Sequence, residues 1–81
     1  MNEIVLIGEV SSNITYFEND KILTLYLKVY NHIFCNYDYI PVNFKSMNYG
    51  DIKNLKGKEI AISGHIEMRN NPIIFVDSFS Y

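Results

Sequence analysis

The sequence has only one cysteine, Cys35, and no apolar run that approaches the length of a membrane-spanning helix. A single cysteine cannot form a disulfide within the chain, which excludes a disulfide-stapled secreted scaffold and favours a reducing compartment. Glu3 stands where a secretory leader would carry basic residues, and the apolar run that follows, Ile4–Ile7, is short. We therefore expect a soluble, unprocessed, cytoplasmic protein with no membrane partner.

The sequence also lacks the residue patterns that catalysis or metal binding requires. His32 and His65 are far apart, and neither has a cysteine or carboxylate at the spacing of a metal site, so we expect surface or loop histidines. No glycine-rich phosphate loop and no serine or cysteine nucleophile paired with a histidine is legible. We expect no catalytic residue, no metal and no cofactor, and hence no enzyme.

A basic excess is missing as well. The net charge is −2, from seven basic and nine acidic residues, whereas nucleic-acid-binding proteins are usually basic. The distribution softens this objection, because residues 28–69 hold six cations and four anions, while residues 1–27 hold one cation and four anions. A local basic patch and an evenly solvated surface both remain compatible with the sequence.

What the chain does contain is a regular alternation of apolar and amphipathic residues over Leu23–Tyr30. Successive side chains of a β-strand point to opposite faces, so this stretch predicts a strand with one face in the core. The inward residues would be Leu23, Leu25, Leu27 and Val29, and the outward ones Thr24, Tyr26, Lys28 and Tyr30. The outward face interleaves aromatic rings with a cation, as single-strand binding requires.

A second strand of the same kind is predicted over Tyr37–Lys45, with Pro41 suited to an edge or a bulge. Its outward residues would be Tyr37, Tyr39, Asn43 and Lys45. If the two strands pair antiparallel, their outward faces merge into one surface rich in tyrosine. The alternative interpretation is that these tyrosines are simply strand residues that pack half-exposed across their neighbours.

The remaining segments complete a short all-β chain, predicted as a single domain over residues 1–81. Ile4–Ile7 is continuously apolar and predicts a strand covered on both sides, with a bend at Gly8 and a continuation over Ile14–Phe17. Asp51 can cap a short helix that contributes Ile52 and Leu55 to the core before Gly57 ends it. Two more strands are predicted at Glu59–Met68, with Met68 facing inward, and at Ile73–Phe79.

Five strands with one short helix between the third and fourth is the order of the oligonucleotide-binding (OB) fold, a Greek-key barrel whose second and third strands form the ligand face. The chain also resembles the bacterial and phage single-stranded-DNA-binding protein family, including the small primosomal restart proteins. The resembling segments are Asn2–Val10, Leu25–Val29, Asp38–Val42 and Leu55–Ile66.

The resemblance implies that Tyr39 occupies the place of a base-stacking aromatic residue and that Phe34 lies in a loop that supplies another. The chain departs from the family in having no tryptophan, in placing Thr15 before Tyr16 where the family tends to have arginine, and in lacking a disordered linker with an acidic tip. Recruitment of other enzymes through such a tail is therefore not expected.

Together these features lead to the hypothesis of a protein that binds single-stranded DNA with little sequence preference, in replication, recombination or restart. The candidate site residues are Tyr16, Tyr26, Lys28, Tyr30, Phe34, Tyr37, Tyr39, Lys45 and Arg69. Two alternatives stay open: an accessory subunit of a polymerase, primase or helicase that uses the tyrosine surface as a protein interface, and a single-stranded RNA binder. The sequence is compatible with replication proteins as partners, and with self-association through exposed edge strands and tyrosine-rich faces.

Overall fold

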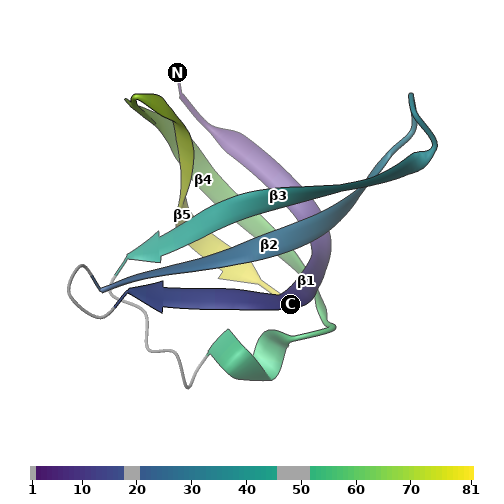
Figure 1. Ribbon diagram of the computed structural model, residues 1–81, viewed down its shortest axis with the longest axis horizontal. Coiled ribbons are helices and arrows are strands. Elements are labelled where there is room, and N and C mark those ends of the chain that lie inside the picture. The colour runs from purple at the N-terminus through teal and green to yellow at the C-terminus, as the bar shows by residue number, and fades with distance from the viewer. Residues whose placement is uncertain (1, 18–20, 46–51) are drawn as a thin grey trace.

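The alternating segments form five β-strands that close into a barrel in the order β1-β2-β3-β5-β4. The computed structural model, shown in Figure 1, describes residues 2–17, 21–45 and 52–81. The strands are β1 (Ile4–Phe17), β2 (Ile22–Asn31), β3 (Asn36–Lys45), β4 (Glu59–Arg69) and β5 (Asn71–Ser80). Neighbours are antiparallel except β3 and β5, which close the barrel in parallel at Asn43 and Phe75. This architecture confirms the predicted five-stranded OB barrel.

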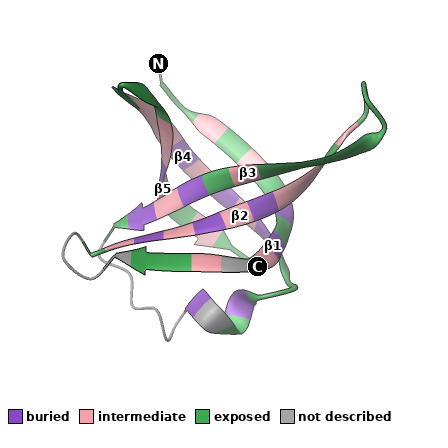
Figure 2. Ribbon diagram, viewed as in Figure 1, coloured by how far each residue is buried: buried purple, intermediate pink, exposed green. Residues whose placement is uncertain are grey.

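The core follows the alternation of β2 and β3 (Figure 2). Leu23, Leu25 and Leu27 are fully buried, and Val42 and Phe44 meet them from β3. Ile60 and Ile62 of β4 complete the barrel interior. Apolar burial of this kind is worth about 25 cal/mol per Å², so a face of leucines determines which side of β2 turns inward.

The predicted short helix between the third and fourth strands is a single 3-10 turn, η1 (Lys53–Leu55). Ile52 and Leu55 are both buried in the core cluster, as predicted. Gly57 then leaves the turn with φ of +79°, a conformation that L side chains rarely adopt. The predicted cap, Asp51, lies outside the described residues.

Two burial predictions are wrong. Val5 and Ile7 of β1 are 65% and 58% exposed, because the outer face of this strand carries no covering layer in the described part of the chain. Met68, predicted to face inward, is 73% exposed. It lies beyond a register shift at Ser63 and Gly64, where β4 runs out into the β4–β5 hairpin.

No helix in the described part of the chain is long and apolar enough to cross a membrane.

Candidate nucleic-acid interface

The antiparallel register of β2 and β3 merges their outward faces, as the sequence predicted. Tyr30 lies opposite Tyr37, and Lys28 lies opposite Tyr39. The next outward pairs along the hairpin are Tyr26 with Pro41 and Thr24 with Asn43. We call the surface formed by Tyr26, Lys28, Tyr30, Tyr37 and Tyr39 the tyrosine face.

Three rings of the tyrosine face are open to solvent. Tyr30 and Tyr37 are exposed, with ring centroids 5.3 Å apart in an edge-to-face arrangement of 75°, whereas Tyr26 is half-buried. Tyr39 is 57% exposed and is the most accessible ring of the face. An exposed phenol ring offers the flat apolar surface on which a nucleobase stacks, and Lys28 places an ammonium group among the rings.

The β2–β3 hairpin extends away from the barrel, and its tip is exposed (Figure 2). Asn31 organises the tip: its Oδ1 accepts hydrogen bonds from the backbone N–H groups of Ile33 (2.9 Å) and Phe34 (3.2 Å). Its Nδ2 donates to Oδ2 of Asp38 at 3.0 Å. This Asx turn holds Phe34 outward, 73% exposed, at the end of the tyrosine face.

Lys45 and Arg69 do not lie among the tyrosines but converge on a carboxylate. Lys45 Nζ is 3.4 Å from Oε2 of Glu67, and an Nη of Arg69 is 3.0 Å from its Oε1. His65 joins them, with Nε2 2.8 Å from Glu67 and Nδ1 3.0 Å from Asp77. We call these residues, Lys45, His65, Glu67, Arg69 and Asp77, the Glu67 cluster.

Contacts within the cluster shift the pKa values of Glu67 and His65. Hydrogen bonds from His65 and Arg69 lower the pKa of Glu67 to about 2. Hydrogen bonds to Glu67 and then to Asp77 raise the pKa of His65 above its usual 6.5. Sequence reasoning missed this cluster, although the alternation of His65, Glu67 and Arg69 on one face of a strand was visible; Asp77 and Lys45 come from other strands.

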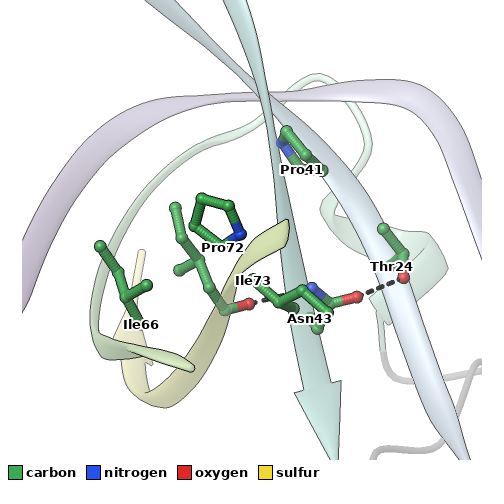
Figure 3. Close-up of a pocket in the computed structure, with 7 residues that line it drawn as sticks. Thr24, Pro41, Asn43, Ile66, Pro72 and Ile73 are labelled. Atoms are coloured by element: carbon green, nitrogen blue, oxygen red, sulfur yellow. Dashed lines mark hydrogen bonds between the residues drawn. The ribbon is translucent and has the colours of Figure 1, made fainter. Parts of the chain in front are cut away.

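A groove of about 420 Å³ lies between β2, β3 and the β4–β5 hairpin (Figure 3). It is lined by Thr24, Pro41, Asn43, Ile66, Pro72, Ile73 and Ile74. Thr24 Oγ1 donates to Asn43 Oδ1 at 2.6 Å, and Asn43 Nδ2 donates to the Ile74 carbonyl at 3.0 Å. Pro41 borders both the groove and the tyrosine face, so the two surfaces are continuous. The groove could not be predicted from the sequence, because it forms only when the barrel closes.

Tyr16 is the candidate that the structure separates from the others. It lies opposite Leu23 in the β1–β2 register, on the side of the sheet that faces the core and not the tyrosine face. Its side chain is exposed, whereas its partner Leu23 is fully buried. The structure therefore does not place Tyr16 beside Tyr26 or Tyr39.

Among the described residues, no group of three or more histidine, cysteine, aspartate or glutamate side chains has the geometry to hold a metal ion.

Solved structures with the same fold include single-stranded-DNA-binding proteins and a PriB domain. The dimeric N-terminal domain of PriB from Thermoanaerobacter tencongensis is 19% identical, with a TM-score of 0.74 over 98% of this chain and 93% of that one. A small single-stranded-DNA-binding protein from Mycoplasma pneumoniae is 15% identical, with a TM-score of 0.75 over 100% and 93%. The single-stranded-DNA-binding (SSB) domain of a Synechococcus protein is 10% identical, with a TM-score of 0.73 over 100% of this chain and 96% of that one.

No protein-family model matches the sequence, and comparison with curated proteins finds no match. The structural likeness confirms that the chain has the fold of the family it resembles in sequence.

Proposed function

We propose that this chain binds single-stranded DNA without catalysis and with little sequence preference. The observation that carries the proposal is the antiparallel pairing of β2 and β3, which sets Tyr30 opposite Tyr37 and Lys28 opposite Tyr39 on one open surface. Stacking on aromatic rings is insensitive to sequence because every base has a π-face. The protein from Mycoplasma pneumoniae that shares this fold is a single-stranded-DNA-binding protein, which supports the same role here.

In this proposal the four tyrosines of the tyrosine face stack bases, and Lys28 contacts a phosphate. Phe34, held at the hairpin tip by Asn31, closes over the strand from one end. Lys45 and Arg69 contribute phosphate contacts at the other end of β3, after the groove. Tyr16, which lies away from the tyrosine face, would need the strand to wrap around the barrel.

The cellular setting belongs to the same proposal. We place the protein in replication, recombination or restart of DNA, in the cytoplasm, where the exposed thiol of Cys35 would stay reduced. Self-association is proposed through the exposed apolar side chains of β1, and the similar PriB domain is dimeric. Replication proteins are the proposed protein partners.

Titration of a fluorescent oligo-dT by anisotropy, at about 50 mM and about 200 mM salt, tests the proposal. We expect binding that weakens with salt, since cations that neutralise phosphates release counterions. The double variant Lys28→Ala with Tyr39→Ala should bind much more weakly, while Lys56→Ala with Tyr81→Ala, outside the tyrosine face, should bind as the wild type does. Absence of binding at micromolar protein and low salt would refute the proposal.

A protein-interaction module is the second candidate, because the chain is acidic and tyrosine is enriched at the cores of protein interfaces. An OB barrel serving as an accessory subunit of a polymerase, primase or helicase would use the same surface. Its affinity should change little with salt, unlike that of a nucleic-acid complex. Competition between DNA and RNA oligomers of equal length separates a DNA binder from an RNA binder.

A further inference from the structure

Glu67 accepts contacts from three basic side chains at once. Its Oε2 faces Lys45 Nζ (3.4 Å) and His65 Nε2 (2.8 Å), and its Oε1 faces Arg69 (3.0 Å). Each of its oxygens is therefore met by a cationic donor. A phosphodiester presents the same pattern, two anionic oxygens that accept charge-assisted hydrogen bonds. The donors around Glu67 are thus arranged as they would be around a phosphate.

Two of these donors, Lys45 and His65, pack on the ring of Phe75 of β5. The Lys45 ammonium lies 4.3 Å from the centroid of the Phe75 ring, and the His65 ring stacks on it at 6.0 Å with an angle of 26°. Phe75 is only 4% exposed, yet it lies opposite His65 on the outer side of the barrel wall. The two basic side chains cover it, which positions them before any ligand arrives.

The net charge of the Glu67 cluster depends on whether His65 is protonated. Both ring nitrogens of His65 face carboxylates, Nε2 toward Glu67 and Nδ1 toward Asp77. Because a neutral imidazole has one N–H, satisfying both requires the imidazolium form. With His65 protonated, Lys45, Arg69 and His65 supply three positive charges against two negative ones. With His65 neutral, the cluster carries no net charge.

We propose that the Glu67 cluster is a phosphate site for the bound strand, and that Glu67 is an internal competitor that a phosphate must displace. The inference rests on the proposed function and adds to it a subsite and the residue that limits it. Lys45 shares the outward side of β3 with Tyr39, about 20 Å away along the strand at 3.4 Å per residue. The groove at Asn43 lies between them. A strand that leaves the tyrosine face along β3 therefore reaches the cluster.

The decisive variant is Glu67→Gln, which keeps the shape and removes the competing charge. We expect it to bind oligo-dT on the order of fivefold more tightly than the wild type at low salt. The slope of log affinity against log salt should become steeper by about 0.7, the increment for one phosphate of a single strand. Adding Lys45→Gln to Glu67→Gln should abolish both gains.

Glu59→Gln is the matched control. Glu59 lies on the same strand, β4, at its other end and opposite Glu9, so the substitution changes the net charge equally but outside the cluster. Circular dichroism and urea unfolding of both variants test whether each is folded. A gain in Glu67→Gln that exceeds the gain in Glu59→Gln supports the inference.

The proton linkage supplies a second readout. Wild-type affinity should be higher at about pH 6 than at about pH 8, and His65→Gln should remove this difference. His32, whose ring lies 4.8 Å from that of Tyr30, also faces the proposed ligand. His32→Gln is therefore the control. If His32→Gln removes the pH dependence of affinity and His65→Gln does not, the inference is overturned.

The outcomes separate the inference from the proposed function. If the wild type binds oligo-dT and Glu67→Gln binds no better than Glu59→Gln, the phosphate site is wrong and the proposed function stands. If neither the wild type nor Glu67→Gln binds, both are wrong.

Discussion

The ammonium nitrogen of Lys28 lies 4.3 Å from the centroid of the Tyr37 ring, on the neighbouring strand. Lys28 is also the direct cross-strand partner of Tyr39. Its position beside both rings limits where the ammonium group can go, since a cation over a ring face is attracted by the ring quadrupole. A phosphate next to a base stacked on Tyr39 would find this cation already in place.

Lys28→Gln should therefore weaken binding of single-stranded DNA and reduce its salt dependence. Loss of one phosphate contact lowers the slope of log affinity against log salt by about 0.7. Anisotropy titrations over a series of salt concentrations measure the slope. Lys56→Gln, which removes an exposed lysine beyond η1, is the control and should leave the slope unchanged. Equal slopes for Lys28→Gln and the wild type would exclude Lys28 from the interface.

Tyr39→Ala should weaken oligo-dT binding by about 5- to 150-fold, because stacking of one base on an aromatic ring is worth roughly 1–3 kcal/mol. Tyr39→Phe keeps the ring and should bind nearly as well as the wild type. Tyr81→Ala removes another exposed tyrosine, outside the tyrosine face, and should have no effect. If the hydroxyl group made the essential contact, Tyr39→Phe would lose as much affinity as Tyr39→Ala, and that result would argue against stacking.

The tyrosine face could be predicted because it depends on two local patterns and one assumption. Alternation over Leu23–Tyr30 and Tyr37–Lys45 determines which residues point outward, since the apolar residues of each strand must face the core. Adjacency in sequence made antiparallel pairing the simplest assumption, and the register confirmed it. The inward positions of Ile52 and Leu55 could also be predicted, because they are the apolar residues of a short polar segment.

What the sequence could not predict depends on contacts between distant strands. The Glu67 cluster combines residues of β3, β4 and β5. Lys45 of β3 comes close to the other members only because β3 and β5 pair in parallel at Asn43 and Phe75. Met68 fits the alternation of β4, but the register shift at Gly64 and the protruding hairpin leave it exposed. Val5 and Ile7 read as buried because they are apolar, whereas burial also needs a layer to cover them.

The pH dependence of stability should reveal the His65–Glu67 pair. Glu67 has a lowered pKa, so its contribution is present above its usual 4.5 and is lost as the pH falls toward 2. His65 has a raised pKa, so its contribution is complete below its usual 6.5 and is lost as the pH rises through its folded value. The pair therefore stabilises the fold most between these two usual values.

Urea unfolding of the wild type and His65→Gln at several pH values measures this contribution. The difference in midpoint should be largest near pH 5 to 6 and should shrink as the pH rises through the raised pKa of His65, above which its imidazole is neutral. His32→Gln, which removes the exposed histidine of the hairpin tip, should show no such profile. A midpoint difference for His65→Gln that is constant with pH would indicate a packing effect on Phe75 and not an ion pair.

Gly64 should tolerate no side chain, because the backbone of β5 passes directly over it. A Cβ at this position would overlap the carbonyl oxygen of Phe75, which is backbone and cannot swing aside. This close approach lies beside the register shift between Ser63 and Gly64. We expect Gly64→Ala to lower the free energy of unfolding by about 1–3 kcal/mol or more, measured by urea denaturation.

Ser63→Ala is the control at the neighbouring position, and it should change the free energy of unfolding by less than about 0.5 kcal/mol. Because Phe75 supports Lys45 and His65, a shift of β5 in Gly64→Ala should also lower the pKa of His65 toward its usual value. Titration of the His65 ring protons by NMR measures this coupling. If Gly64→Ala is as stable as the wild type and His65 titrates unchanged, the close approach of β4 and β5 does not hold the cluster in place.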